Sequence, residues 1–342
     1  MTELLDRRLV FITGKGGVGK TTLAAALGYL AAKLGKKVLL CELEPRGNLP
    51  LVLGLKGTAY NPRQADDNLY VMSMDTGRAL AEYAQITLKL PYFASIGPLG
   101  NIIELFSMAA PGVREILSVG KLCYEIHEGN YDLVIADASA TGHIAGIMRA
   151  SKNVHDLTAT GVIRNQTSWM DDILYDPEQT SIAITATPQE TPVTETLDLF
   201  STLLSSLGNP SSLIFVNKVT AELFSKKEER LFYMLTDGKA TSQHGGQFVS
   251  GKAAVSQQKT AGEEPLLENL FSIADLATQV RRSEEVHLTR LESGLKLISE
   301  NKKYVSPETY YIPYLFFGKD LFAMTKQAAR HLAEELSIEL SS

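Results

Sequence analysis

The sequence predicts an α/β fold, a doubly wound, mostly parallel sheet with an inserted helical subdomain. The first observation is an apolar run at 8–13, a glycine-rich loop, a helical pattern over 20–34 and a second apolar run at 36–43. That order is typical of a parallel β-α-β unit. The second observation is that short apolar runs recur with helical stretches between them. We expect these further strands at 68–75, 131–137, 181–187, 211–217 and 309–315.

Two stretches do not fit the sheet and form the predicted helical subdomain. Residues 76–128 have a mostly helical pattern that three prolines divide, and residues 143–178 form a second irregular helical segment. Because both flank the strand at 131–137, we expect them to meet on one side of the sheet. A helical excursion over 220–300 contains a Gly-, Ser- and Gln-rich stretch at 237–264, which we expect to be a mobile loop. The whole chain of 342 residues is expected to be a single domain.

Composition limits the classes of partner. The net charge of −6 argues against a nucleic-acid binder, which would usually carry a basic surplus. The cysteines, Cys41 and Cys123, have no C-x-x-C spacing, which excludes a disulfide framework, and we expect both thiols to be buried. Since the sequence shows neither a secretory signal nor about 18 consecutive apolar residues, we expect a cytoplasmic protein without an integral membrane segment.

The glycine-rich loop has the pattern of a phosphate-binding loop. GKGGVGKT, from Gly14 to Thr21, fits G-x-x-x-x-G-K-[ST] and stands between a predicted strand and a predicted helix. Glycines let successive backbone N–H groups point at phosphate oxygens, and the helix N-terminus adds a partial positive charge. We expect Lys20 to reach the β- and γ-phosphates and the Thr21 hydroxyl to bind Mg²⁺. The pattern therefore predicts a P-loop NTPase, whose nucleotide-binding residues are Gly14, Gly16, Gly17, Val18, Gly19, Lys20, Thr21 and Thr22.

A second lysine, Lys15, follows the first glycine of the loop and is not explained by this geometry. The loop amides and Lys20 already surround the phosphates of their own nucleotide. Lys15 is either a solvated loop residue or a cation that reaches the phosphates bound by a facing subunit, as arginine fingers do in other nucleotidases.

Several segments resemble one group of P-loop proteins. KGGVGKTT resembles the deviant P-loop of the partition and Min-system ATPases, the nitrogenase iron protein and the arsenical-pump ATPases. Two later segments, DASATGH at 137–143 and VLLCELEPRGNL at 38–49, narrow the resemblance to the arsenical-pump and tail-anchored-protein-targeting ATPases. Three further segments resemble family motifs and occur in the same order along the chain as in the family: PGVREIL at 111–117, TPQETPVTET at 187–196 and VNKV at 216–219. The chain is most similar to the bacterial arsenical-pump-like ATPases that occur as paired sets in actinobacteria.

This resemblance implies ATP and Mg²⁺ as cofactors and assigns four catalytic residues. Lys20 would contact the phosphates, and Lys15 would act across the interface of a homodimer or of a heterodimer with a paralogue. Glu44 would begin the first switch and polarise the attacking water, at the place where the family has an aspartate. Asp137 would be the Mg²⁺-sensing carboxylate of the second switch and, with Thr21, a metal ligand.

The resemblance also assigns the base site. Asn217 would contact the adenine edge, and Pro313 to Phe317 would wall the base. Thr141 to His143 would form the mobile part of the second switch. Alternatives remain open at three positions: Asp137 binds the metal or caps a helix, Asn217 contacts adenine or makes a turn, and Arg46 belongs to the first switch or is solvated.

The chain also departs from the family's pattern. Two scattered cysteines are too few for a soft arsenite site, and the C-x-x-C through which zinc bridges the targeting ATPases is absent. Glu44 extends one methylene further than an aspartate, and a displacement of about 1 Å can slow a reaction about 10²-fold. Ala140 stands where the family has a proline.

The apolar residues within 93–108 leave two interpretations of the helical subdomain open. They form either a groove for a hydrophobic client segment, as in the targeting ATPases, or a closed core. We expect a Mg²⁺-dependent ATPase that switches conformation with nucleotide as a dimer and handles or targets a hydrophobic protein client. The alternative is a nucleotide-gated regulatory or scaffold ATPase with a soluble protein partner. The cysteine count disfavours an arsenite pump.

Overall fold

The computed structural model describes residues 3–88, 113–138, 144, 146–148, 169–207, 210–236, 264–315 and 320–338. These residues contain an eight-stranded sheet in the order β3-β4-β2-β5-β1-β6-β7-β8. All neighbours are parallel except the β3–β4 pair. The predicted α/β fold is confirmed. The strands are β1 (Leu9–Gly14), β2 (Val38–Glu42), β3 (Arg63–Asp66), β4 (Leu69–Ser73), β5 (Leu133–Asp137), β6 (Thr180–Ala186), β7 (Ser211–Val219) and β8 (Glu308–Pro313).

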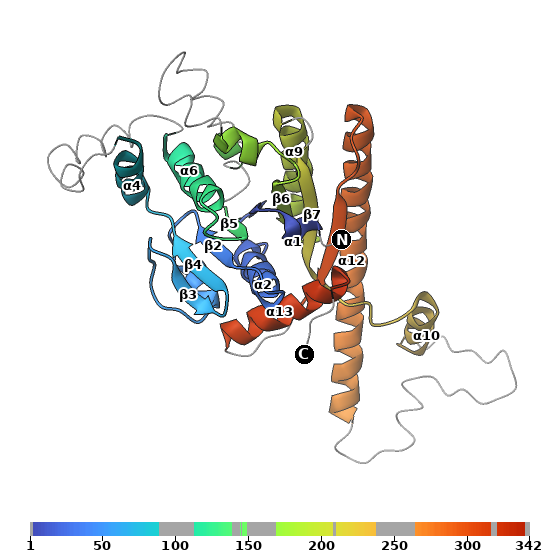
Figure 1. Cartoon of the computed structure of the whole chain (residues 1–342). Coiled ribbons are helices and arrows are strands. Elements are labelled where there is room, and N and C mark those ends of the chain that lie inside the picture. Colours follow the sequence, from blue (N-terminus) through green and yellow to red (C-terminus); the bar gives the residue numbers. More distant parts are fainter. Residues whose placement is uncertain are drawn as a thin grey trace, which may run out of the picture.

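Helices cover both faces of this sheet (Figure 1). The described helices are α1 (Glu3–Asp6), α2 (Lys20–Lys33), α3 (Asn48–Val52), α4 (Thr76–Leu88), α6 (Val113–His127), α9 (Glu190–Leu207), α10 (Lys226–Thr236), α12 (Glu264–Lys302) and α13 (Leu321–Glu335). On one face α2 and α13 pack together, and on the other α9 lies between the sheet and α12. Residues 89–112, most of 139–168 and the predicted loop 237–263 lie outside the described residues.

Each of the seven strands expected from apolar runs is present, but one strand was not expected. The missed strand, β3, is the sequence RQAD at the edge of the sheet, and it pairs antiparallel with β4. A charged edge strand has neither a buried face nor apolar alternation, so the pattern that identifies inner strands is absent from it. By contrast, every residue of β1, β2 and β5 is buried, as expected for strands covered on both faces.

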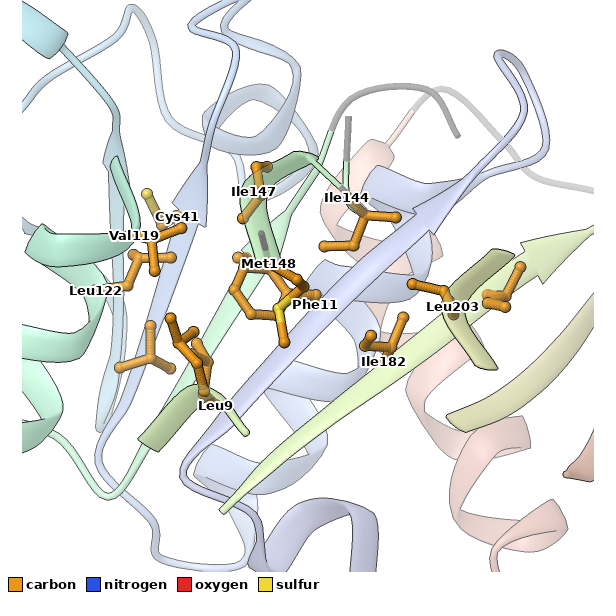
Figure 2. Packing of buried hydrophobic residues seen from close by; sticks show 14 of the residues in the cluster. Leu9, Phe11, Cys41, Val119, Leu122, Ile144, Ile147, Met148, Ile182 and Leu203 are labelled. Atoms are coloured by element: carbon orange, nitrogen blue, oxygen red, sulfur yellow. The ribbon is translucent and has the colours of Figure 1, made fainter. Parts of the chain in front are cut away.

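Alternating residues of β1 face two separate cores. Leu9 and Phe11 belong to the core shared with α6, α9 and α12, whereas Val10 and Ile12 belong to the core shared with α2 and α13. Figure 2 shows the first core, in which Phe11 lies among side chains from β6, α6 and α9 and those of Ile144, Ile147 and Met148. Both cysteines are buried in this core as free thiols, as predicted.

A buried polar network joins α4 and α6, the two described helices of the segment 76–128. This segment is part of the predicted inserted subdomain and is called the insertion below. Lys121 Nζ donates to Glu82 Oε1 and Glu125 Oε1, each at 2.7 Å, and its side chain is 9% exposed. The Tyr60 hydroxyl also donates to Glu82. Tyr60 lies in the loop that follows α3, so this network connects the loop after the predicted first switch with the base of the insertion.

Helix α12 has 39 residues and is therefore about 58 Å long. Its C-terminal half packs on α9, and Gly294 permits this close approach, because a Cβ there would lie 2.8 Å from Leu197 Cδ1. Toward its N-terminus the helix packs against α10 through stacked Phe271 and Phe232. None of the described helices is both long and apolar enough to cross a membrane.

Candidate functional site

A cavity of about 560 Å³ opens at the carboxyl ends of the central strands, where ligands bind in sheets of this topology. It brings together nearly all of the predicted nucleotide residues from five separate segments of the chain. Three predicted residues, Gly14, Lys15 and Val18, do not line it. The lining includes Gly16, Gly17, Gly19, Lys20, Thr21, Thr22, Glu44, Asp137, Asn217 and Pro313.

The turn from β1 into α2 requires glycine at Gly14 and Gly19. Gly14 has φ +144°, and a Cβ there would lie 2.1 Å from the carbonyl oxygen of Thr185 on β6. Gly19 has φ +101°, and a Cβ there would lie 2.2 Å from the side-chain nitrogen of Asn217. The loop therefore fits between two neighbouring strand ends only because these residues have no side chain.

Lys20 lies across this loop. Its Nζ donates to the carbonyl oxygens of Gly14 at 3.0 Å and Lys15 at 2.9 Å. Burial lowers the pKa of Lys20, while the Asp137 carboxylate opposes that shift. The ammonium group is thus held over the loop, in position to contact an anion that the loop amides bind.

Asp137 and Thr21 form the contact at the centre of the site. Thr21 Oγ1 donates to Asp137 Oδ2 at 2.7 Å, and Asp137 is 7% exposed. Burial raises the pKa of Asp137 to about 6, against the opposing effects of the Thr21 hydrogen bond and of Lys20. A buried carboxylate beside a hydroxyl provides the hard oxygen ligands that Mg²⁺ prefers.

These two residues fit a magnesium ion bound mainly through water and phosphate. The described residues contain no group of three or more His, Cys, Asp and Glu side chains that could hold a metal by themselves. Mg²⁺ sites commonly use one or two protein ligands and complete their octahedron with water and substrate phosphates. Thr21 and Asp137 would supply the protein ligands of such a site.

The first-switch segment contains a buried carboxylate that sequence reasoning missed. Glu42, at the end of β2, is 3% exposed. It accepts hydrogen bonds from the backbone N–H groups of Gly47 and Asn48, each at 2.9 Å, and from Ser73 Oγ at 3.2 Å. Glu42 thereby holds the turn that leads from β2 into α3. The acidic residue inside the apolar run VLLCEL could have indicated a structural role for Glu42. A charged side chain at a buried strand position is rarely found without hydrogen-bond or ionic partners.

Glu44 lies in the turn that Glu42 holds, and it lines the cavity. Its carboxylate is paired with Arg46, with Arg46 Nη2 at 2.6 Å from Glu44 Oε2. Both side chains reach the solvent, since they are 40% and 72% exposed. The structure therefore places Arg46 at the nucleotide cavity together with the predicted switch carboxylate.

Asn217 lines the cavity, but its side chain is already bonded within the protein. Its Nδ2 donates to the Val18 carbonyl oxygen at 2.8 Å, and its Oδ1 accepts from the backbone N–H of Lys218 at 2.9 Å. The next side chain, Lys218, donates to the Gly17 carbonyl oxygen at 3.0 Å. Strand β7 thus braces the phosphate loop through two consecutive side chains. The adenine contact of Asn217 remains a prediction.

Beside the predicted base-binding residue Pro313, the cavity has a wall that was not anticipated. Pro313 lines it as expected, together with Tyr314 and Leu315. Helix α13 adds Met324, Ala328 and Leu332, from a segment to which no role was assigned. Residues 316–319 and the second-switch residues Thr141–His143 lie outside the described residues.

Lys15 points away from this cavity. Its Nζ lies 2.7 Å from Glu195 Oε1 on α9, and the two side chains are 34% and 36% exposed. Lys15 instead lines a second hollow of about 730 Å³, formed with residues 187–192 and α12. The two loop lysines therefore face opposite sides of the loop.

The comparison with protein families agrees with this geometry. Residues 7–167, which carry the loop, the first switch and Asp137, match the family described as anion-transporting ATPase. Over this segment the chain is similar to that ATPase family.

Individual relatives of the chain come from bacteria and fungi. ATPase BagA of Mycobacterium tuberculosis is 29% identical over 234 residues, 64% of this chain and 66% of that protein. The putative arsenical pump-driving ATPase 2 of Aquifex aeolicus is 30% identical over 43% of this chain and 50% of its own. ATPase GET3 of Podospora anserina is 28% identical over 42% of this chain and 43% of its own. The chain thus spans about two thirds of the mycobacterial relative and half or less of the other two.

Replacing Asp137 by Asn should change the pH dependence of stability. Because the pKa of about 6 in the folded protein lies above the ordinary aspartate value of 3.8, the folded state holds the proton more tightly than the unfolded state. Ionisation of Asp137 therefore destabilises the fold as the pH rises from about 4 to about 6, by about 2–3 kcal/mol at neutral pH. Asp137→Asn should melt at a higher temperature than wild type at pH 7.5, and this advantage should shrink at pH 4.

The measurement is thermal unfolding without nucleotide or Mg²⁺, since a bound cation would favour the ionised form. Asp132→Asn is the control, because Asp132 precedes the same strand but is exposed. A difference between Asp137→Asn and wild type that does not vary with pH would contradict the raised pKa.

Proposed function

We propose that the chain is a Mg²⁺-dependent ATPase that changes conformation with its nucleotide as a dimer and handles a hydrophobic protein segment. The observation that carries the catalytic part is the Thr21–Asp137 pair beside Lys20 in one cavity at the end of a phosphate loop. The family of residues 7–167 supports the same chemistry.

Each residue of the cavity has a distinct task in ATP hydrolysis. The loop amides and Lys20 would bind the β- and γ-phosphates and offset negative charge as it shifts during transfer. Thr21 and Asp137 would hold Mg²⁺, which neutralises phosphate charge when it is bound. Glu44 would accept a hydrogen bond from the attacking water and orient it. The apolar wall formed by β8 and α13 would hold the base.

Two sets of contacts would transmit a conformational change from the nucleotide site to the insertion, one from each switch segment. Asp137 ends β5, and Ile144, Ile147 and Met148, shortly after it in the chain, pack in the core beside α6 (Figure 2). On the other side of the site, the loop after α3 reaches Glu82 on α4 through Tyr60. Both switch segments thus lead to the helices at the base of the insertion, where two arrangements would differ with the bound nucleotide.

The position of Lys15 supports a dimer. Its side chain is partly exposed, lies on the outer side of the loop and is paired with Glu195 of its own chain. A half-exposed ion pair contributes little to stability, so Lys15 can exchange Glu195 for a phosphate group of a facing subunit at low cost. We propose that it does so in a homodimer or in a heterodimer with a paralogue.

The apolar residues of the insertion support the client. Residues 93–108 include Phe93, Ile96, Leu99, Ile102, Ile103, Leu105, Phe106 and Met108. In the chain they lie between α4 and α6, the two helices that the Tyr60–Glu82–Lys121 network joins. We propose that these residues bind a hydrophobic protein segment.

Lys20→Ala should abolish tight ATP binding or hydrolysis, because the β- and γ-phosphate charge loses its buried partner. We expect kcat/KM to fall by roughly 10²-fold or more. Steady-state phosphate release with Mg²⁺ measures this loss. Lys33→Ala is the control on the same helix, since Lys33 is partly exposed and pairs with Asp66 away from the cavity. Wild-type turnover in Lys20→Ala would refute the ATPase assignment.

Lys15→Ala should bind ATP nearly normally, since Lys20 and the loop amides remain, but hydrolyse it slowly. Excess Lys20→Ala subunits should restore part of its activity, because a mixed dimer has one intact loop facing one intact Lys15. Cationic fingers contribute on the order of 10³-fold in other systems, and an already slow enzyme will show a smaller loss.

Glu195→Gln separates this role from a structural one. It breaks the ion pair but leaves Lys15 free to act, so it should keep its activity. An equal loss of activity in Glu195→Gln and Lys15→Ala, or no rescue under conditions where subunits demonstrably exchange, would rule out action across the interface.

The double substitution of Ile103 and Phe106 by serine should weaken binding of an apolar helical peptide and leave ATP hydrolysis unchanged. Ile273 and Leu276 on α12, each 62% exposed, give a matched control when both are changed to serine. Fluorescence anisotropy of a labelled peptide measures binding. If the first pair instead lowers the melting temperature by several degrees, those residues form a closed core. If the α12 pair loses binding, the client site lies on α12.

A further inference from the structure

We propose that Arg46 is a catalytic arginine that contacts the γ-phosphate of the nucleotide bound by its own subunit, and that its ion pair with Glu44 is the contact it gives up to do so. This inference rests on the proposed ATPase function. It assigns a role to Arg46, a charged residue that lines the same cavity. Neither the P-loop pattern nor the metal site accounts for this side chain.

The backbone of Arg46 is firmly held although its side chain is exposed. The Arg46 N–H donates to the Glu44 carbonyl oxygen at 2.7 Å, which makes a tight turn. The next two N–H groups, those of Gly47 and Asn48, donate to the buried carboxylate of Glu42. Gly47 itself has φ +78°, a conformation that favours glycine. Arg46 therefore extends from a fixed point at the edge of the cavity.

The guanidinium group is free to move from this fixed point. Its side chain is 72% exposed, and Glu44 is its only ion-pair partner among the described residues. Arg46 acts electrostatically on the pKa of Lys20, which places its charge near the phosphate end of the cavity. Lys20 occupies the inner side of the loop, where it is bonded to two loop carbonyl oxygens. Arg46 lines the same cavity from the first-switch turn, so a terminal phosphate held by the loop would lie within its reach.

Energetics favour the exchange of Glu44 for a phosphate. An exposed ion pair contributes only about 0–1 kcal/mol. A guanidinium group binds phosphate oxygens through two parallel charge-assisted hydrogen bonds, which are stronger and geometrically specific. The exchange also frees the Glu44 carboxylate, which can then accept a hydrogen bond from water.

The exchange places both residues where hydrolysis needs them. The water oxygen forms a bond to the γ-phosphorus while the bond from that phosphorus to the β–γ bridging oxygen breaks. The electron pair of the broken bond leaves on ADP, and a water proton passes to the released phosphate or to solvent. Arg46 stabilises the negative charge on the γ-phosphoryl oxygens, and Glu44 orients the lone pair of the attacking water toward the γ-phosphorus.

An opposite role for Arg46 has the same resting geometry. If Arg46 only restrained Glu44, the pair would be an inhibitory contact, and removing the guanidinium group would release the carboxylate. The two roles differ in sign: Arg46→Ala lowers kcat if the arginine contacts phosphate and raises kcat if it restrains Glu44.

The test compares ADP with a non-hydrolysable ATP analogue by calorimetric titration in the presence of Mg²⁺. Wild type should bind the analogue more tightly than ADP. Arg46→Ala should lose about tenfold or more of that preference, with ADP affinity within about twofold of wild type, because only the analogue carries a γ-phosphate. Its kcat should fall by on the order of 10²- to 10³-fold. Arg46→Lys should recover affinity for the analogue but little of the kcat, since an ammonium group lacks the two-pronged geometry.

Arg78→Ala is the matched control. Arg78 is 65% exposed and pairs with Asp75 outside the cavity, so this variant should match wild type in both titrations. Melting temperatures should be equal for all variants, because every substituted side chain is exposed.

Three results would overturn the inference: an equal loss of affinity for ADP and the analogue, an unchanged preference, or a higher kcat in Arg46→Ala. In each case wild type still binds and hydrolyses ATP, so the ATPase function stands. If wild type binds neither nucleotide and behaves like Lys20→Ala, the proposed function fails, and the role of Arg46 fails with it.

Discussion

The rest of the structure depends on the position of β1 between β5 and β6. Parallel pairing on both sides buries every residue of β1 and brings its carboxyl end beside those of its neighbours. The loop that follows must then turn sharply against Thr185 on one side and return as α2 on the other, which only a glycine at Gly14 permits. The same pairing sets Ile12 opposite Asp137, so the Asp137 carboxylate reaches the loop as a consequence of strand register.

Lys20, Lys15 and Arg46, all at or next to the phosphate loop or the first-switch turn, differ in how firmly the protein holds them. Lys20 is partly buried and bonded to two carbonyl oxygens of the loop, so it is available to every nucleotide that enters. Lys15 and Arg46 each rest on one partly exposed carboxylate, Glu195 and Glu44. A weak ion pair of this kind positions a cation but costs little to break, so the cation can bind another anion instead. The fixed lysine is suited to binding, and the two paired cations are suited to roles that arise only when phosphates or a second subunit are present.

Buried carboxylates organise the protein side of the same site. Glu42 and Asp137 are opposite each other on neighbouring strands, and neither is exposed by more than 7%. Glu42 is fully bonded to backbone N–H groups and to Ser73, which makes it a structural support for the first switch. Among the described residues, the Asp137 side chain accepts a hydrogen bond from one side chain, Thr21, and burial raises its pKa to about 6. Its poorly satisfied charge is the one that a metal ion would stabilise.

The sequence by itself determined seven of the eight strands of the described sheet, in their order along the chain, and the identity of the phosphate loop. These features depend on residues close together in the chain, where apolar periodicity and glycine spacing are visible directly. Tertiary structure alone decided which distant residues meet: Lys15 with Glu195, Asn217 with the loop carbonyl of Val18, and α13 with the base end of the cavity. It also decided that Glu42 supports a turn, because a strand pattern shows that a charge is buried but not which N–H groups will satisfy it. Such contacts arise from strand order and helix packing across the whole fold, and no local spacing encodes them.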